Sequence, residues 1–154
     1  MIFLNSPTVQ QLGEGAELAL HAFRLMAAGA DASALVAAFD ARLGPPGREA
    51  LGAMHVLVHE IAAAGGRRLT IACPGCCRLT GDELSVLGLL AAAQGHDLDR
   101  MSPHVRCLLA GRASETAGRA ALAFGGLLRD AGLPVEAAPG DSAAAYTLRV
   151  AGNA

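Results

Sequence analysis

The sequence contains no lysine and no tryptophan, and aromatic residues make up only 3% of its 154 residues. All 12 basic residues are arginines, which, together with the abundance of alanine and glycine, is typical of a bacterial genome rich in G and C. Apart from Arg67-Arg68 these arginines are scattered, and the formal net charge is −2. No basic patch would neutralise a phosphate backbone, so we expect no binding to nucleic acid.

Long apolar runs are missing as well. His, Glu or Arg interrupts every candidate before it reaches the roughly 18–20 residues that span a bilayer. The N-terminal residues 1–5 lack the basic region and the apolar length of a signal peptide. We therefore expect a cytoplasmic protein with no membrane association. Because thiols stay reduced in the cytosol, its four cysteines point to metal binding, redox chemistry or burial before disulfides.

The residues that are abundant predict a helical protein. Hydrophobic residues, mostly Ala, Leu and Val, make up 53% of the chain and charged residues 17%. A chain this apolar gains enough from burial to offset its ordering entropy, and its length suits one domain with its own core. Ala and Leu are strong helix formers. We expect a single helical domain over residues 1–154.

Helical periodicity predicts a mainly α fold, an antiparallel bundle of five or six helices joined by short loops. The predicted helices cover residues 7–28, 31–42, 48–64, 80–94, 102–110 and 114–131. Glycines and prolines mark most of their ends. Thr80 and Glu83 form a capping box at the start of the fourth helix. Pro103 is placed in the first turn of the fifth helix, where its missing N–H costs nothing.

Two segments alternate with the period of a strand. Leu69 and Ile71 alternate with polar neighbours just before the cysteines, and residues 146–150 alternate near the C-terminus. Residues 2–4 are a candidate third strand. We therefore expect a small two- or three-stranded sheet near the cysteine cluster.

The most distinctive motif is Cys73-Pro74-Gly75-Cys76-Cys77. The spacing C-x-x-C lets two thiolates reach one metal ion from a tight turn, which Pro presets and Gly permits through a positive φ. Structural zinc takes four N or S ligands in a tetrahedron, and a second C-x-x-C is missing. Cys77, Cys107 or histidines would have to complete the set.

His55 and His59 are the best complement to the cysteines. They lie four residues apart, so both rings project from one helix face, and their helix ends shortly before Cys73. The predicted ligands are Cys73, Cys76, Cys77, His55 and His59, and the expected metal is zinc. The alternative is that both histidines are exposed on a solvent face. The segment His-Val-Leu-Val-His is not the His-Glu-x-x-His of zinc peptidases, and we predict no catalytic residue.

Thiol redox chemistry is an alternative function for the cluster. A strand that leads into Cys-Pro-Gly-Cys and then a helix resembles, over about ten residues, the active site of thioredoxin-like and glutaredoxin-like proteins. There the helix N-terminus stabilises the thiolate of the first Cys. Here the capping box starts the helix at Thr80, several residues after Cys73, and the expected βαβ framework is absent upstream.

Two further alternatives involve no chemistry. The cysteines could be buried as small apolar residues, which is the expected role of Cys107. The surplus of Ala, Leu and Val also fits a helical scaffold that self-associates, so a homo-oligomer is expected. Glu14, Glu17, His21 and Arg24 form a stripe on the first helix that we interpret as a solvated face, because Glu-x-x-x-His is not the spacing of di-iron bundles.

Overall fold

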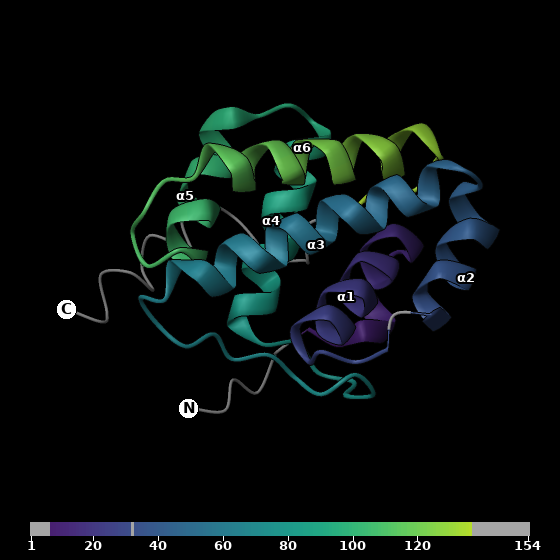
Figure 1. Ribbon diagram of the computed structural model, residues 1–154, viewed down its shortest axis with the longest axis horizontal. Coiled ribbons are helices and arrows are strands. Elements are labelled where there is room, and N and C mark those ends of the chain that lie inside the picture. Colours follow the sequence, from purple (N-terminus) through teal and green to yellow (C-terminus); the bar gives the residue numbers. More distant parts are fainter. Residues whose placement is uncertain (1–6, 32, 137–154) are drawn as a thin grey trace.

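The computed structural model describes residues 7–31 and 33–136 (Figure 1). The helices of these residues are, in chain order, η1 (Val9–Gln11, a 3-10 helix), α1 (Glu14–Ala27), α2 (Ser33–Leu43), α3 (Pro46–Ala64), α4 (Gly81–Gln94), α5 (Leu98–Leu108) and α6 (Glu115–Asp130). The mainly α fold with six α-helices is thus confirmed for the described part of the chain. None of the described helices is long and apolar enough to cross a membrane.

Helix α4 is the central element of the core. It packs against α1, α5 and α6, and in Figure 1 it runs behind α3 and α6. From Glu83 to Gln94 only Leu84 and Ala91 are half-buried, and every other residue is buried. A helix that is apolar almost all round belongs in a protein interior.

A glycine brings α5 close to α4. A Cβ built on Gly88 would lie 2.5 Å from the Cε1 atom of His104, so no larger residue fits unless that ring moves. His104 therefore packs directly on the backbone of α4.

Helices α3 and α6 lie along each other and run in opposite directions (Figure 1). Phe124 of α6 also meets Phe39 of α2, with ring centroids 6.1 Å apart in a tilted arrangement. Small residues let the backbones approach, and large ones fill the layer between them. The fully buried residues of these two helices include Ala50, Met54, Leu57, Ala117, Ala121, Phe124 and Leu128.

Three helix starts follow the expected sequence signals. Helix α3 begins at Pro46, two residues before the predicted start. The capping box of α4 is present, with the Thr80 hydroxyl accepting from the Glu83 amide at 3.1 Å. In α6 the Ser114 hydroxyl accepts from the Ala117 amide at 3.0 Å.

The predicted start of the first helix at Pro7 is wrong. Helix α1 begins at Glu14, after Gly13 in an extended conformation. Thr8 instead forms an isolated antiparallel bridge with Arg78, and the Val9 amide donates to the Cys77 carbonyl at 2.8 Å. Pairing with a distant segment therefore prevails over the local helical pattern.

The predicted start of the fifth helix at Ser102 is also wrong. Helix α5 begins at Leu98, because Asp97 caps it by accepting from the Arg100 amide at 3.1 Å. Pro103 consequently lies inside the helix and not in its first turn.

The expected sheet is not found, since residues 7–31 and 33–136 contain no named strand. Leu69 and Ile71 are half-buried while Arg68 and Thr70 are exposed, as their alternation predicts. However, the amides of Thr70 and Ala72 donate to the carboxylates of Asp82 and Glu83, at 2.7 and 2.9 Å, and to no partner strand. The other two expected strands, residues 2–4 and 146–150, lie outside the described residues.

Candidate functional site

The candidate site is the cysteine turn, which we define as residues 73–77, in the segment between α3 and α4. The Cys76 amide donates to the Cys73 carbonyl at 3.0 Å, which closes a β-turn with Pro74 and Gly75 at its corners. Gly75 is not among the described glycines of positive φ, contrary to our expectation. A Cβ built on it meets no described atom within 4 Å. The turn is therefore shaped by Pro74 and does not require a glycine at position 75.

The thiols of this turn face outward. All four cysteines of the chain lie among the described residues and are free; Cys73 and Cys77 are exposed, whereas Cys76 and Cys107 are half-buried. Burial as small apolar side chains therefore does not explain Cys73 and Cys77. Cys107, which we expected to be buried, is only half-buried. Its Sγ atom lies 3.6 Å from the Ser85 hydroxyl.

A buried ion pair lies beneath the turn. Arg24 of α1 is 4% exposed and Glu83 of α4 is 0% exposed. The Nε atom of Arg24 donates to Oε1 of Glu83 at 2.7 Å, and Nη2 donates to Oε2 at 2.9 Å. Such two-point contacts between guanidinium and carboxylate are the strongest and most directional of side-chain hydrogen bonds.

The same two side chains bind the backbone on both sides of the turn. Arg24 donates to the carbonyls of Cys76 and Arg78, at 2.7 and 2.8 Å. Glu83 accepts from the amides of Ala72 and Thr80, both at 2.9 Å. We call this arrangement of Arg24, Glu83 and the four backbone groups the Arg24–Glu83 clamp. Because four of its bonds end on the backbone at or near the cysteines, the turn is held in one conformation while the exposed Cys73 and Cys77 remain accessible.

The clamp also places a positive charge near the thiols. The hydrogen bond with Glu83 raises the pKa of Arg24 above its ordinary value, burial opposes that rise, and the negative charges of Glu83, Cys76 and Cys73 add to it. The guanidinium therefore lies within electrostatic reach of both thiols of the C-x-x-C pair. Its charge is matched by the carboxylate of Glu83, with which it forms the buried ion pair.

Our expectation that Arg24 belongs to a solvated stripe is wrong. Glu14, Glu17 and His21 are exposed as expected, but Arg24 is buried. The spacing of Arg24 could have indicated its burial, because Arg24 lies four residues after Leu20, which is itself buried. Residues four apart share a helix face, so a charged residue in that register predicts a buried partner.

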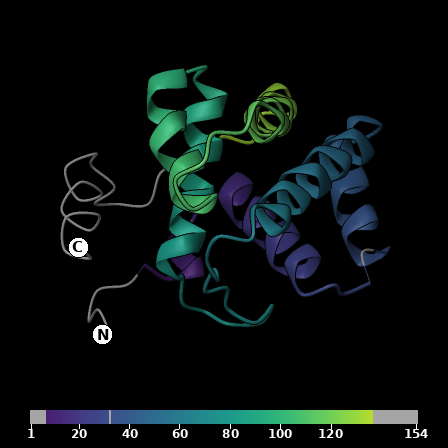
Figure 2. The same cartoon turned by 60° about the vertical axis from the view of Figure 1, so that its left-hand side comes forward.

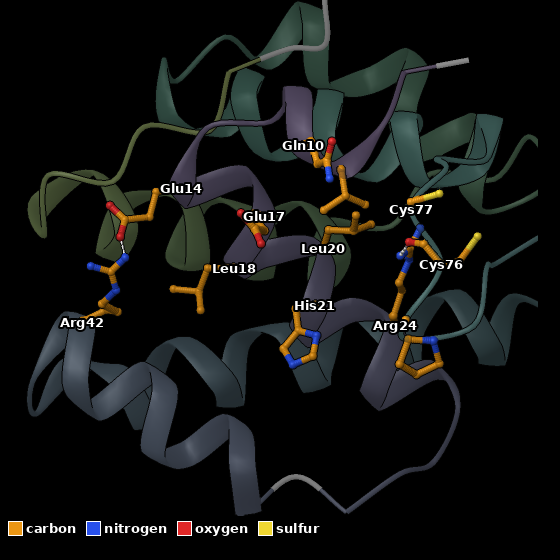
Figure 3. Close-up of a pocket in the computed structure, with 13 residues that line it drawn as sticks. Gln10, Glu14, Glu17, Leu18, Leu20, His21, Arg24, Arg42, Cys76 and Cys77 are labelled. Atoms are coloured by element: carbon orange, nitrogen blue, oxygen red, sulfur yellow. Dashed lines mark hydrogen bonds and ion pairs between the residues drawn. The ribbon is translucent and has the colours of Figure 1, made fainter. Parts of the chain in front are cut away.

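A cleft of about 530 Å³ lies beside the turn, between it and the outer face of α1 (Figure 3). Glu17 and His21 line it from α1, and Cys76 and Cys77 line it from the turn. An ion pair between Arg42 and Glu14 lies at the opposite side. The half-buried Cys76 thus borders a space that is open to small molecules.

The structure brings some of the predicted ligands together and not others. Cys73, Cys76 and Cys77 share one turn, whereas His55 and His59 are exposed on α3. Within the described ranges 7–31 and 33–136, no three His, Cys, Asp or Glu side chains are placed to hold one metal ion. The predicted five-residue set is therefore not assembled there, and metal binding by the cysteines stays a prediction.

Comparison with known proteins adds no family to this description. No protein-family model matches the sequence, and no match is found among curated proteins or solved structures. The cysteine turn and the clamp beneath it are therefore the features that indicate a function.

Proposed function

We propose that this chain is a small zinc-binding protein whose metal ion is held by the thiolates of Cys73 and Cys76. One observation carries the proposal: the thiols project from a turn whose backbone is fixed on both sides by the buried Arg24–Glu83 clamp. Neither packing nor a disulfide explains exposed, free cysteines in such a position. A rigid frame beneath accessible ligands is what a metal site needs.

The chemistry of the donors fits zinc in kind. Thiolate sulfur is among the preferred zinc ligands, and the two ends of a C-x-x-C turn can reach the same ion. Bonds that orient the ligands from behind raise metal affinity, and their loss typically weakens it by about 10–100-fold. The clamp is positioned to do this through the carbonyl of Cys76, which accepts from Arg24 at 2.7 Å.

The donors fall short in number, because a tetrahedral site takes four and the C-x-x-C pair supplies two. Cys77 is the nearest additional thiol, being adjacent to Cys76 in the same turn. His55 and His59 lie apart from the turn, on the exposed face of α3. Neither these histidines nor Cys77 complete a group of three such donors among the described residues. The remaining ligands therefore come from Cys77 or from outside this chain.

Elemental analysis of untagged protein purified under reducing conditions tests the proposal. We expect bound zinc that is lost in Cys73→Ser and in Cys76→Ser. Cys107→Ser is the matched control and should keep its zinc, because Cys107 lies at the end of α5 and outside the turn. Fully reduced thiols without bound zinc, in protein that has been supplied with the ion, would overturn the proposal.

One observation favours a second function, thiol–disulfide exchange. The hydrogen bond from the Cys76 amide to the Cys73 carbonyl keeps the two Cα atoms within the roughly 7 Å of a β-turn, close to the range that a disulfide spans. In this reaction the two thiols lose their protons and two electrons to an oxidising disulfide, which becomes two thiols. Quantitative formation of a Cys73–Cys76 bond with oxidised glutathione, at a potential near that of cellular thiols and without bound zinc, would favour this function over metal binding.

A further inference from the structure

A zinc ion on the cysteine turn would have unfilled positions. Zinc at structural sites takes four N or S ligands, and Cys73 and Cys76 supply two. Glu17 and His21 line the same cleft as Cys76, from the side of α1. However, no three such donors among the described residues are placed to hold one metal ion. Completion of the tetrahedron therefore requires ligands that approach from the solvent side.

The turn is accessible from that side. In Figures 1 and 2 the segment between α3 and α4 runs along the outer edge of the helices and not between them. Cys73 and Cys77 are exposed. A second protein surface can therefore reach the thiols without displacing any part of the core.

We propose that this second surface is another copy of the same chain, so that Cys73 and Cys76 of two copies hold one zinc ion between them. This inference rests on the proposed zinc binding. A two-fold dimer presents the same patch twice, so two identical C-x-x-C turns provide four sulfurs and no other donor is needed. It also accounts for a chain that carries one C-x-x-C where a complete site needs two.

Rigidity and charge favour the same arrangement. Because the clamp already fixes the turn, little conformational entropy is lost when two turns meet around an ion. Four thiolates around one zinc ion carry a net negative charge. Arg78 follows Cys76 by two residues and is exposed, so each copy has one guanidinium on the same exposed segment. The charge of the buried Arg24 is already matched by Glu83.

Light scattering after gel filtration, together with native mass spectrometry of the full reduced chain, tests this arrangement. With zinc we expect a dimer that contains one ion per two chains, and with a strong chelator we expect monomers. Cys76→Ser should lose both the ion and the dimer. Cys107→Ser and Cys77→Ser should keep both, since neither removes a sulfur of the C-x-x-C pair, and circular dichroism verifies that each variant is folded.

The outcomes separate this inference from the function on which it rests. A monomer that binds one zinc ion per chain would overturn the dimer and leave zinc binding intact. Loss of zinc from folded Cys77→Ser would also overturn it, because a third thiol of the same turn would then be a ligand. Protein that binds no zinc at all would overturn both.

Discussion

Two regions of this protein are ordered by different physical means. Helices α3 and α6 are joined by buried apolar side chains such as Met54 and Phe124. The segment 65–80 has no named helix or strand. It is held by polar side chains that reach its backbone, chiefly Arg24, Asp82 and Glu83. The first region is held by packing that has no direction, and the second by a few directional bonds.

This difference explains why the accessible thiols lie in the segment between α3 and α4. An apolar interface tolerates changes spread over many contacts, and it offers no reactive group to solvent. Directional bonds can fix a short irregular segment while leaving its side chains free. The cysteine turn is in the second region. Its shape depends on Glu83, which follows it closely in the chain, and on Arg24, which lies 52 positions from Cys76.

The largest expected effect comes from breaking the clamp. Glu83→Ala leaves the guanidinium of Arg24 buried without its carboxylate, and the loss of one partner of a buried ion pair costs about 3–5 kcal/mol. Urea denaturation measures this change in the free energy of unfolding. Glu115→Ala is the control, since its i,i+4 ion pair with Arg119 is 78–79% exposed and such pairs contribute little. Equal stability of the two variants would contradict a structural role for the clamp.

Truncation of the apolar region is expected to destabilise the protein by a similar amount but with a different pattern. Phe124→Ala removes a fully buried ring that contacts Phe39, at a cost of about 3–5 kcal/mol. In hydrogen exchange, Glu83→Ala should expose the amides of residues 72–80 first. In Phe124→Ala, the protection of these amides should fall only as much as that of the core amides, so the difference between the two sets should stay the same. The same exchange pattern in both variants would show that the two regions are not independent.

A smaller effect is expected for Thr80→Ala. The Thr80 hydroxyl accepts from the Glu83 amide and donates to the Thr70 carbonyl at 2.6 Å. Loss of a helix cap costs about 0.5–2 kcal/mol. Ser114→Ala removes the equivalent cap of α6 and is the matched control. Only Thr80→Ala should also speed the alkylation of Cys73, and identical thiol reactivity in the two variants would argue against coupling between cap and turn.

The smallest effect is expected at the corner of the turn itself. Gly75→Ala should change stability by less than about 0.5 kcal/mol, because its φ is not positive and its Cβ meets no described atom within 4 Å. Gly65→Ala is the contrast, since Gly65 has φ +60°, where an added Cβ costs about 1–2 kcal/mol. Thermal denaturation of the two variants gives the comparison, and a larger loss at Gly75 would mean that the turn is built differently.

The same division governs how much of the fold could be predicted from the sequence. Helix periodicity and caps placed α3, α4 and α6 within two residues of their starts, since those signals are local. The Leu69–Ile71 alternation correctly predicted burial but not a strand. An alternating pattern does not reveal that carboxylates of α4 would bind the amides in place of a neighbouring strand.

The candidate site was only half predictable. The cysteine turn is evident from C-x-x-C, whereas the clamp joins residues 59 positions apart in the chain. Arg24 could have been suspected from its register with Leu20, but nothing local identifies Glu83 as its partner. Glu83 was correctly assigned to a capping box, and its second role is visible only in three dimensions.

The central claim is that the Arg24–Glu83 clamp holds the cysteine turn ready for a zinc ion. Competition with a chromophoric chelator measures zinc affinity in the reduced wild type and in Glu83→Gln, at a temperature where circular dichroism shows both to be folded. We predict binding by the wild type that is weakened by about 10–100-fold in the variant. Equal affinities, or no binding by the wild type, would contradict the claim.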